Sequence, residues 1–381
     1  MLVGIDAHDV RGVGEATPLP GWTESLTDCR TALDAVAAAG DDALFDAVAD
    51  AGDAPDPLND APPSVTDPLD DAPAARHAVE HALLDAAGRY AGRSLASLLT
   101  DGPAATVPVN ATLGDADVDA TVTAATEAVE AGFDCLKLKV GVGALDRDVT
   151  RLRAVRDAVG ADVALRADAN GAWNRETAME AVDAFAALDL AYLEQPLPAG
   201  DLSGHAALRD RGVDVAVDET LAEMHPAAVL EAGAADVLIL KPMALGGPGR
   251  AYRAATDARA AGVDPVVTTT IDAVPARTAA VHVAAAIPDV RACGLATGSA
   301  LATDLAADPV PVDRGTIAVP EGSGSPATPS TIWCDHRRSY RNPRRTGRMT
   351  TGRMLYVLGL FAVLVFSLGI AVIWALSYGP L

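Results

Sequence analysis

Five charged residues stand at nearly regular intervals in the middle of this sequence, each at the end of a short apolar run. They are Lys139, Asp168, Glu194, Asp218 and Lys241. Successive members are 29, 26, 24 and 23 residues apart, which is about the length of one strand followed by one helix. Residues that recur at this interval occupy equivalent positions at the carboxyl ends of parallel strands, where barrel enzymes hold their active sites.

The acidic members of the series, Asp168, Glu194 and Asp218, would offer a metal ion only oxygen ligands. With few protein ligands and room left for water and substrate, such a set favours Mg²⁺ over Ca²⁺, with Mn²⁺ as a substitute. No Cys or His stands at these strand ends, which argues against zinc. Glu219 is the alternative third ligand. Asp218 is preferred because it shares the inward direction of Ala216, which leaves Glu219 to support it.

Two lysines, Lys139 and Lys241, flank the acids at the two ends of the series. A lysine near other cations releases its proton more readily, so it can act as a base near neutral pH. A metal would stabilise negative charge that develops on a substrate carboxylate. Together these parts suit removal of a proton next to a carboxylate, through an enediolate. The chain has only three lysines, and the third is Lys137.

Residues at positions i and i+2 of a strand point to the same face, so Lys137 and Arg166 are expected to point inward beside Lys139 and Asp168. The sequence leaves open whether Arg166 binds a substrate carboxylate or pairs with Asp168. Taken singly, an acid at a strand end is more often a helix cap or a surface ion pair, and a Lys-x-Lys pair more often marks a solvated strand. The complete series favours a functional site over these interpretations.

The series lies within alternating strands and helices. Runs rich in valine, isoleucine and leucine predict eight strands, at residues 106–113, 135–140, 163–168, 191–194, 213–218, 237–241, 263–270 and 290–295. Ala-rich stretches predict helices at residues 117–132, 146–159, 175–188 and 248–261. This alternation predicts a parallel sheet closed into a (β/α) barrel, and an open doubly wound sheet is the competing arrangement. Residues 1–100 lack the alternation and predict a separate unit with helices near residues 28–49 and 74–90.

Acidic residues dominate the composition, with 52 Asp and Glu against 29 Lys and Arg and a formal net charge of −23. Such a body repels nucleic acid, which excludes nucleic-acid binding as the function. An acidic surface with almost no lysine resembles that of proteins from salt-loving cells. The four cysteines form no Cys-x-x-Cys pair, which argues against a zinc ribbon or a redox dithiol.

The C-terminal end has the opposite character. Residues 331–381 contain seven arginines and one acid, and residues 355–376 carry no charge. An apolar helix of that length is on the order of 30 Å long, enough to cross a bilayer. The pattern predicts a basic linker at 321–353 and a transmembrane helix at 354–377, with a buried core helix as the alternative. The positive-inside rule then places the body in the cytoplasm, tethered to the membrane; the N-terminus shows no signal peptide.

The strand-end residues lie in motifs that together resemble the enolase superfamily, specifically its muconate-lactonising subgroup. These motifs are Lys-Leu-Lys (137–139), Asp-Ala-Asn with a following Trp (168–173), Glu-Gln-Pro (194–196), Asp-Glu-Thr (218–220) and Lys-Pro with a following Gly-Gly (241–247). Within the subgroup, residues 14–22, 109–113 and 294–305 are similar to the o-succinylbenzoate synthase family of menaquinone biosynthesis. The resemblance covers residues 12–320.

The resemblance implies a catalytic (β/α) barrel at 101–320 behind an α+β capping domain at 1–100, with Mg²⁺ and a small carboxylate substrate. The implied reaction is the syn dehydration of 2-succinyl-6-hydroxy-2,4-cyclohexadiene-1-carboxylate to 2-succinylbenzoate. Lys139 would remove the α-proton and then protonate the departing hydroxyl, Lys241 would stabilise the enediolate, and Lys137 would adjust the basicity of Lys139. The residues implied to support these groups or contact substrate are Arg166, Asn170, Glu219, Thr269, Thr270, Gly294 and Leu295.

The subgroup also contains dipeptide epimerases, N-succinylamino acid racemases and muconate cycloisomerases, which share the metal-binding and lysine residues. An epimerase would use Lys139 and Lys241 as bases on the two faces of one carbon. A third interpretation is a non-catalytic, membrane-tethered remnant, because the capping domain is expected to be truncated and to lack the family's first strands and substrate-covering loop. Members of the subgroup often form dimers or larger rings, so the resemblance also implies a homo-oligomer.

Overall fold

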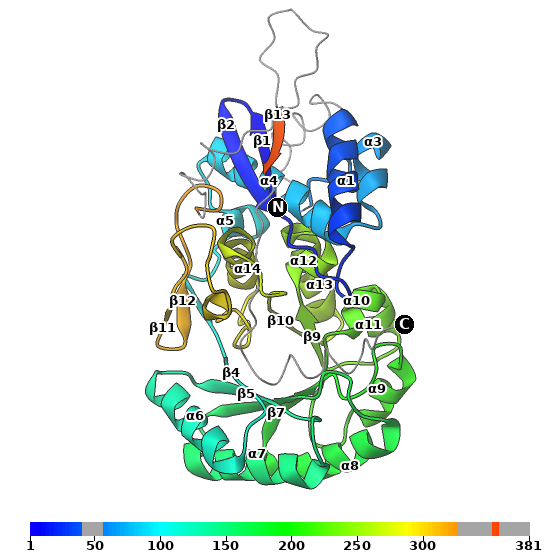
Figure 1. Cartoon of the computed structure of the whole chain (residues 1–381), viewed down its shortest axis with the longest axis vertical. Coiled ribbons are helices and arrows are strands. Elements are labelled where there is room, and N and C mark those ends of the chain that lie inside the picture. The colour runs from blue at the N-terminus through cyan, green and yellow to red at the C-terminus, as the bar shows by residue number, and fades with distance from the viewer. Residues whose placement is uncertain (40–55, 327–352, 358–381) are drawn as a thin grey trace, which may run out of the picture.

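The computed structural model of the chain describes residues 1–39 and 56–326, and the backbone of residues 353–357. Two parts are visible in Figure 1, a capping part (residues 1–39 and 56–99) above a barrel part (residues 106–326). The capping part contains β1 (Leu2–Ala7), β2 (Val10–Glu15), α1 (Leu26–Ala39), α3 (Pro63–Thr66), the 3₁₀ turn η1 (Asp67–Leu69), α4 (Pro73–Ala91) and α5 (Leu95–Leu99).

The barrel part follows the predicted alternation of strands and helices. Its strands are β3 (Thr106–Pro108), β4 (Ala111–Leu113), β5 (Cys135–Lys139), β6 (Ala164–Asp168), β7 (Leu190–Glu194), β8 (Val215–Val217), β9 (Val237–Leu240), β10 (Asp264–Val267), β11 (Val312–Asp313) and β12 (Thr316–Ala318). Its helices are α6 (Val118–Glu130), α7 (Leu145–Val159), α8 (Arg175–Phe185), α9 (Leu202–Leu208), α10 (Thr220–Glu223), α11 (Pro226–Glu231), α12 (Pro242–Leu245), α13 (Pro248–Ala260) and α14 (Val274–Ala286), with 3₁₀ turns η2 (Ala186–Leu188) and η3 (Gly298–Ala300).

The main sheet is a curled parallel sheet of seven strands in the order β10-β9-β8-β7-β6-β5-β4. Its strands are short apolar runs that helices cover, as expected for a parallel sheet that is buried on both faces. The prediction of eight barrel strands was wrong at residues 290–295, where the described chain has no regular strand. Two isolated bridges, Val109 to Cys293 and Thr268 to Gly294, instead connect this segment to both edges of the sheet. The predicted first strand is also split, because β3 leaves the sheet to pair with β12.

The capping sheet has the order β13-β1-β2, in which β13 is Arg353–Val357 and runs antiparallel to β1. This corrects the start of the transmembrane helix predicted at 354–377, because residues 354–357 are extended and paired with a neighbouring strand. The remainder of that segment, and most of the predicted linker, lie outside the described residues. Among the residues that the structure describes, no helix is long and apolar enough to cross a membrane.

Helix α4 joins the two parts, with β1 and β2 on one side and α12 and α13 on the other. Small residues allow this close packing. A side chain at Gly12 would place its Cβ 1.9 Å from the carbonyl oxygen of Ala82, and one at Gly14 would lie 1.9 Å from that of Ala78. Strand β2 therefore lies directly on the backbone of α4, a contact that only glycine permits.

Two acids of the capping part complete this arrangement by accepting hydrogen bonds at helix N-termini. Glu24 accepts from the backbone N–H groups of Ala74 and Ala75, at 3.0 and 2.9 Å, and so caps α4. Glu15, at the end of β2, accepts from Ala273 and Ala276 at 2.9 and 3.0 Å and so caps α14 of the barrel part. Each carboxylate satisfies donors that a helix leaves unpaired at its first turn.

Three histidines are fully buried where the two parts meet, His77 and His81 on α4 and His282 on α14. Within the described structure, both ring nitrogens of His81 and of His282 lack a hydrogen-bond partner. Burial lowers the pKa of His77 and of His282 to about 4, and burial lowers the pKa of His81 well below its usual value. The fold therefore holds all three rings in the neutral form.

Acid should destabilise the fold through these rings. An unfolded histidine takes up a proton near pH 6.5, whereas the folded His282 stays neutral down to about pH 4, so the unfolded state binds more protons in this window and stability falls as pH falls. The variant His282→Leu removes one such group. From pH 7 to pH 4 it should lose less unfolding free energy than the unchanged protein, by on the order of 3 kcal/mol, as measured by urea unfolding.

The buried acids Glu15 and Glu80, whose pKa values are raised by burial, act in the opposite direction, so only the difference between variant and unchanged protein is informative. His225→Asn is the matched control, because His225 is exposed and an asparagine retains its cap on α11. Equal pH dependence of His282→Leu and the unchanged protein would contradict the prediction.

Candidate active site

The carboxyl ends of five neighbouring strands bring the predicted series together. Lys139, Asp168 and Glu194 are the last residues of β5, β6 and β7, and Asp218 and Lys241 directly follow β8 and β9. The register pairs Lys139 with Asp168, and Asp168 with Glu194, so these residues are direct neighbours across the sheet. One charged residue per strand therefore stands in a continuous row.

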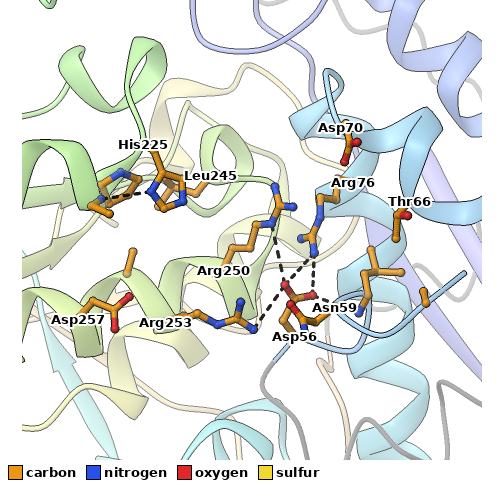
Figure 2. Close-up of a pocket in the computed structure, with 15 residues that line it drawn as sticks. Asp56, Asn59, Thr66, Asp70, Arg76, His225, Leu245, Arg250, Arg253 and Asp257 are labelled. Atoms are coloured by element: carbon orange, nitrogen blue, oxygen red, sulfur yellow. Dashed lines mark hydrogen bonds and ion pairs between the residues drawn. The ribbon is translucent and has the colours of Figure 1, made fainter. Parts of the chain in front are cut away.

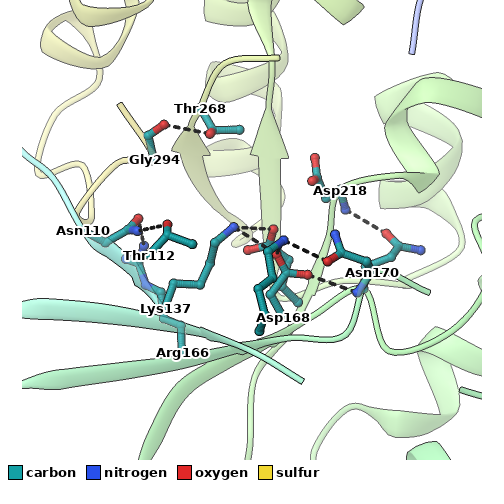
Figure 3. A network of polar contacts seen from close by, with 12 residues as sticks. Asn110, Thr112, Lys137, Arg166, Asp168, Asn170, Asp218, Thr268 and Gly294 are labelled. Atoms are coloured by element: carbon teal, nitrogen blue, oxygen red, sulfur yellow. Dashed lines mark hydrogen bonds and ion pairs between the residues drawn. The ribbon is translucent and has the colours of Figure 1, made fainter. Parts of the chain in front are cut away.

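Ammonium groups contact every carboxylate of this row, and Figure 3 shows Lys137 reaching toward the acids beside Asp168. The Nζ of Lys139 lies 2.7 Å from Oδ2 of Asp168, and the Nζ of Lys241 lies 2.7 Å from Oδ2 of Asp218. The Nζ of Lys137 bridges two acids, at 3.1 Å from Oδ2 of Asp168 and 2.9 Å from Oε1 of Glu194. All three carboxylates are buried, and a buried carboxylate keeps its charge only when such partners are close.

The acids differ in how completely their charge is balanced. Burial alone would raise the pKa of Asp168, but the ammonium groups of Lys139 and Lys137 lower it well below the usual value. Burial and the charge of Asp168 raise the pKa of Glu194 to about 7, and burial raises the pKa of Asp218 to about 6. The lysines therefore balance the negative charge of Glu194 and Asp218 less completely than that of Asp168.

Three acid oxygens at the site are buried without a hydrogen-bond partner among the described residues, namely Oε2 of Glu194, Oδ1 of Asp218 and Oε2 of Glu219. Buried oxygens of this kind are suited to a hard divalent cation. In the described residues, no three His, Cys, Asp or Glu side chains yet surround one point closely enough to coordinate an ion, because lysines hold the inner oxygens. The donor set fits Mg²⁺ once the outer oxygens turn toward it, and it leaves Asp218 and Glu219 both available as third ligand.

Sequence reasoning missed the side chains that hold this row in place. The buried amide of Gln195 accepts hydrogen bonds from the backbone N–H groups of Asp218 and Thr220, at 2.8 and 3.2 Å. The guanidinium of Arg151 on α7 is fully buried and donates to the carbonyl oxygen of Lys139 at 2.9 Å. A polar residue directly after an acid at a strand end, and an arginine on the apolar face of α7, were the available signals.

Asn170, predicted to support the site, connects two of its members. Its Oδ1 accepts from Nζ of Lys139 at 2.8 Å, and its Nδ2 donates to Oε1 of Glu219 at 2.9 Å. Arg166 lies deeper in the barrel and contacts neither Asp168 nor open space. It donates to the carbonyl oxygen of Ala292 at 2.6 Å and lies over the ring of Tyr192, so the structure gives it a supporting position inside the sheet.

The capping part contributes a residue, Trp22, that the sequence indicated only as part of the motif at residues 14–22. The ring of Trp22, in the loop between β2 and α1, lies with its centroid 3.2 Å from Nζ of Lys241. An aromatic face attracts an ammonium group through its electron-rich surface. Among the described residues, Lys241 therefore contacts both Trp22 and Asp218, whereas the polar contacts of Lys139 are with Asp168 and Asn170.

The remaining predicted residues lie at the ends of β10 and of the segment at 290–295. Thr269 shares a hydrogen bond with Thr297 at 3.0 Å, and Thr270 donates to Asp272 at 2.5 Å. Gly294 lies against Thr268, and Leu295 is fully buried in the hydrophobic core. Hydroxyl groups and backbone thus form this side of the site. This side of the site also contains an acid, Asp272. Burial and the charge of Glu15 raise the pKa of Asp272 to about 7.

Comparisons with known proteins agree with this geometry. A hydrophobic dipeptide epimerase from Enterococcus faecalis is 35% identical over 222 residues, 56% of this chain and 61% of the epimerase. An o-succinylbenzoate synthase from Thermobifida fusca is 36% identical over 220 residues, again 56% of this chain and 67% of the relative. The chain thus matches about three fifths to two thirds of the length of these curated relatives.

A solved structure extends the likeness over both parts. The Enterococcus faecalis dipeptide epimerase, crystallised with Mg and the dipeptide L-Leu-L-Tyr, has a TM-score of 0.70 and 28% identity, covering 83% of this chain and 87% of the epimerase. The family model described as enolase C-terminal domain-like matches residues 120–330, which contain the whole row of strand-end residues. The chain belongs to the enolase superfamily, through its C-terminal domain family.

Proposed function

We propose that the chain is a Mg²⁺-dependent lyase that dehydrates 2-succinyl-6-hydroxy-2,4-cyclohexadiene-1-carboxylate to 2-succinylbenzoate. The observation that carries the proposal is the row itself, in which Lys139 and Lys241 flank three buried carboxylates at adjacent strand ends. The identity to an o-succinylbenzoate synthase supports it. This reaction would be a step of menaquinone biosynthesis in the cytoplasm.

One base is sufficient for this reaction. Acting as the base, Lys139 takes the proton from the carbon next to the carboxylate, and the electron pair left behind is delocalised as an enediolate. The hydroxyl on the neighbouring carbon leaves with the proton that Lys139 returns to it, so that water is released and the ring becomes aromatic. Because both groups leave from the same face, Lys139 returns to its starting protonation state.

Glu194 and Asp218, with Glu219 as the alternative to Asp218, would hold the metal through the outer oxygens described above, and Asp168 would complete the ligand set. When bound, Mg²⁺ supplies electrostatic stabilisation to the negative charge on the substrate carboxylate. Lys137 stays cationic between Asp168 and Glu194, whose charges raise its pKa well above the usual value despite burial. Lys241 is held on Trp22 and Asp218, which suits a fixed positive charge beside the enediolate.

The side of the site at Thr269, Thr297 and Gly294 favours a dehydratase over a dipeptide epimerase. A dipeptide carries a free ammonium group that needs a charged acceptor, and a buried ammonium without one is costly. In the described part of this side, the acid is Asp272, which is buried, bonded to Thr270, and has its pKa raised to about 7. Hydroxyl groups can donate hydrogen bonds to the carboxylate of a succinyl arm, whereas they offer an ammonium group no opposite charge.

Epimerisation of an amino-acid derivative is the second candidate function. The presence of lysines at both ends of the row favours it, because an epimerase removes a proton on one face and returns one on the other. An epimerase is also among the similar proteins, with 35% identity. The experiments below distinguish the two.

Replacing the proposed base should abolish the reaction. We expect Lys139→Ala to lower kcat by about 10²–10⁴-fold, the usual contribution of a general base, because the proposal assigns the proton transfer to this side chain. The assay follows loss of diene absorbance in molar KCl with Mg²⁺. Arg175→Ala is the control, since Arg175 pairs with Asp201 at the surface and should leave kcat unchanged.

The same proteins are incubated with N-succinylamino acids and dipeptides in D₂O. A protein that leaves the diene unchanged but exchanges the α-proton of either compound would be an epimerase or racemase and not the proposed lyase. A folded protein that does neither would contradict both functions.

Metal binding should depend on the outer oxygens. We expect Mn²⁺ or Mg²⁺ to raise the Tm of the unchanged protein, because a cation neutralises buried acids whose charge is not balanced. Asp218→Asn should remove this rise, whereas Glu219→Gln should keep most of it. Electron paramagnetic resonance of Mn²⁺ gives an independent measure. The reverse result would make Glu219 the third ligand, and an unchanged rise in both variants would contradict the proposed metal site.

Trp22 should matter through its ring. Loss of a partly buried cation–π contact is worth about 1–2 kcal/mol, so Trp22→Leu should lower kcat by roughly tenfold, while Trp22→Phe keeps an aromatic face and most of the rate. The measurement is kcat separately from KM, with Tm as the check on folding. Equal loss in the leucine and phenylalanine variants would show that bulk, and not the aromatic face, is what the site uses.

A further inference from the structure

A cavity of about 440 Å³ lies apart from the row of strand-end residues, between the two parts of the molecule (Figure 2). Its walls are residues 56–76 of the capping part and helices α11 and α13 of the barrel part. The described residues that line it include none of the proposed base, fixed cations or metal ligands. The proposed function therefore makes no use of it.

A buried ion pair forms one wall. Nη2 of Arg76 lies 2.7 and 2.8 Å from the two carboxylate oxygens of Asp56, and both side chains are almost fully buried. Arg76 also pairs with Glu80 and donates to the carbonyl oxygen of Gly246 at 2.8 Å. Both oxygens of Asp56 thus accept from Arg76, and Oδ1 accepts in addition from the backbone N–H of Leu58 at 3.1 Å.

Two further guanidinium groups face the same carboxylate without binding it closely. Arg250 and Arg253 stand one turn apart on α13, with Nε of Arg250 at 3.9 Å and Nη2 of Arg253 at 3.7 Å from Oδ2 of Asp56. These distances exceed those of hydrogen bonds. Within the described residues, neither guanidinium donates a recorded hydrogen bond, and the side chains are 41% and 44% exposed.

Among the described residues, Asp56 is the acid within ion-pair distance of these two arginines, and it is shared with Arg76. Burial and the nearby charge of Arg76 lower the pKa of Arg250, although nearby acids act in the opposite direction. The two other acids that line the described part of the cavity, Asp70 and Asp257, make no ion pair with Arg250 or Arg253. In the part of the chain that the structure describes, two guanidinium groups that donate no hydrogen bond therefore open onto a cavity, in a protein whose net charge is −23.

We propose that this cavity binds a small oxyanion, a phosphate or carboxylate group, through Arg250 and Arg253. Guanidinium groups donate paired hydrogen bonds in a planar fork that matches these anions. Leu58, Pro226 and Leu245 line the same cavity and offer an apolar surface to the rest of such a molecule. Because the walls come from both parts, the bound anion would hold the capping part against the barrel part.

The purely structural alternative is that the three arginines serve only to hold Asp56. It predicts that removing Arg250 and Arg253 lowers stability equally with and without an anion. The binding proposal predicts that removal eliminates the gain in stability that the anion gives. The two interpretations therefore differ in the anion-dependent part of the stability alone.

The test measures Tm of the full chain at constant ionic strength, with KCl replaced stepwise by potassium phosphate in one series and by potassium citrate in another. We expect a saturable rise of a few degrees in at least one series, because a ligand that binds only the folded state stabilises it. The variant Arg250→Gln/Arg253→Gln should lose that rise. Arg259→Gln, on the same helix but paired with Asp264, should keep it.

A rise with phosphate alone would assign a phosphate ligand, and a rise with citrate alone a carboxylate ligand. If the double variant does not fold, Arg253→Gln replaces it, and calorimetric titration with the same anions gives the affinity directly. No rise in either series, or an equal rise in the double variant and in Arg259→Gln, would overturn the proposal. Since no catalytic readout is used, these outcomes do not depend on the proposed lyase.

Discussion

Three carboxylates buried at adjacent strand ends need positive charge within a few ångströms, and this requirement governs the centre of the molecule. The chain meets it with its only lysines, Lys137, Lys139 and Lys241, each bonded to at least one of the acids. The compensation is incomplete on one side, where acid oxygens lack partners among the described residues. A site organised in this way is stable enough to fold and keeps acid oxygens open to the proposed cation.

The rest of the barrel part serves to keep these groups at fixed positions. Parallel register sets the spacing along the row, and buried polar side chains fix the strand ends that carry it. Arg151 holds the backbone at Lys139, and Gln195 holds the backbone at Asp218. Such supports restrict the motion of the reactive groups, which is how an active site keeps its geometry before substrate arrives.

Much of this arrangement could be predicted from the sequence, because a regular interval between charged residues reflects a regular sheet. The grouping of Lys139, Asp168, Glu194, Asp218 and Lys241 needed only the length of a strand–helix unit. The contact of Trp22 with Lys241 could not be predicted in this way, since the two are far apart in the chain and meet only through the docking of the capping part. The position of Arg166 beneath the row also depends on packing that no local pattern records.

Predictions based on hydropathy alone were less successful, for a physical reason. An apolar run buries its side chains equally well in a helix or in an added strand, so periodicity does not separate the two over a few residues. Residues 353–357 illustrate this, because they pair with β1 where a helix was expected. The segment at 290–295 shows the same weakness, since two backbone bridges replace the strand that its composition favoured.

The caps that cross between the two parts have a consequence for how such proteins can be recombined. Glu15 closes the first turn of α14, and Glu80 of α4 accepts from the N–H of Gly249 at the start of α13. Each barrel helix thus completes its hydrogen bonding with a residue from the other end of the chain. A chimera that joins the capping part of one relative to the barrel of another must therefore inherit matching acids and helix starts together, or both helices begin with unsatisfied donors.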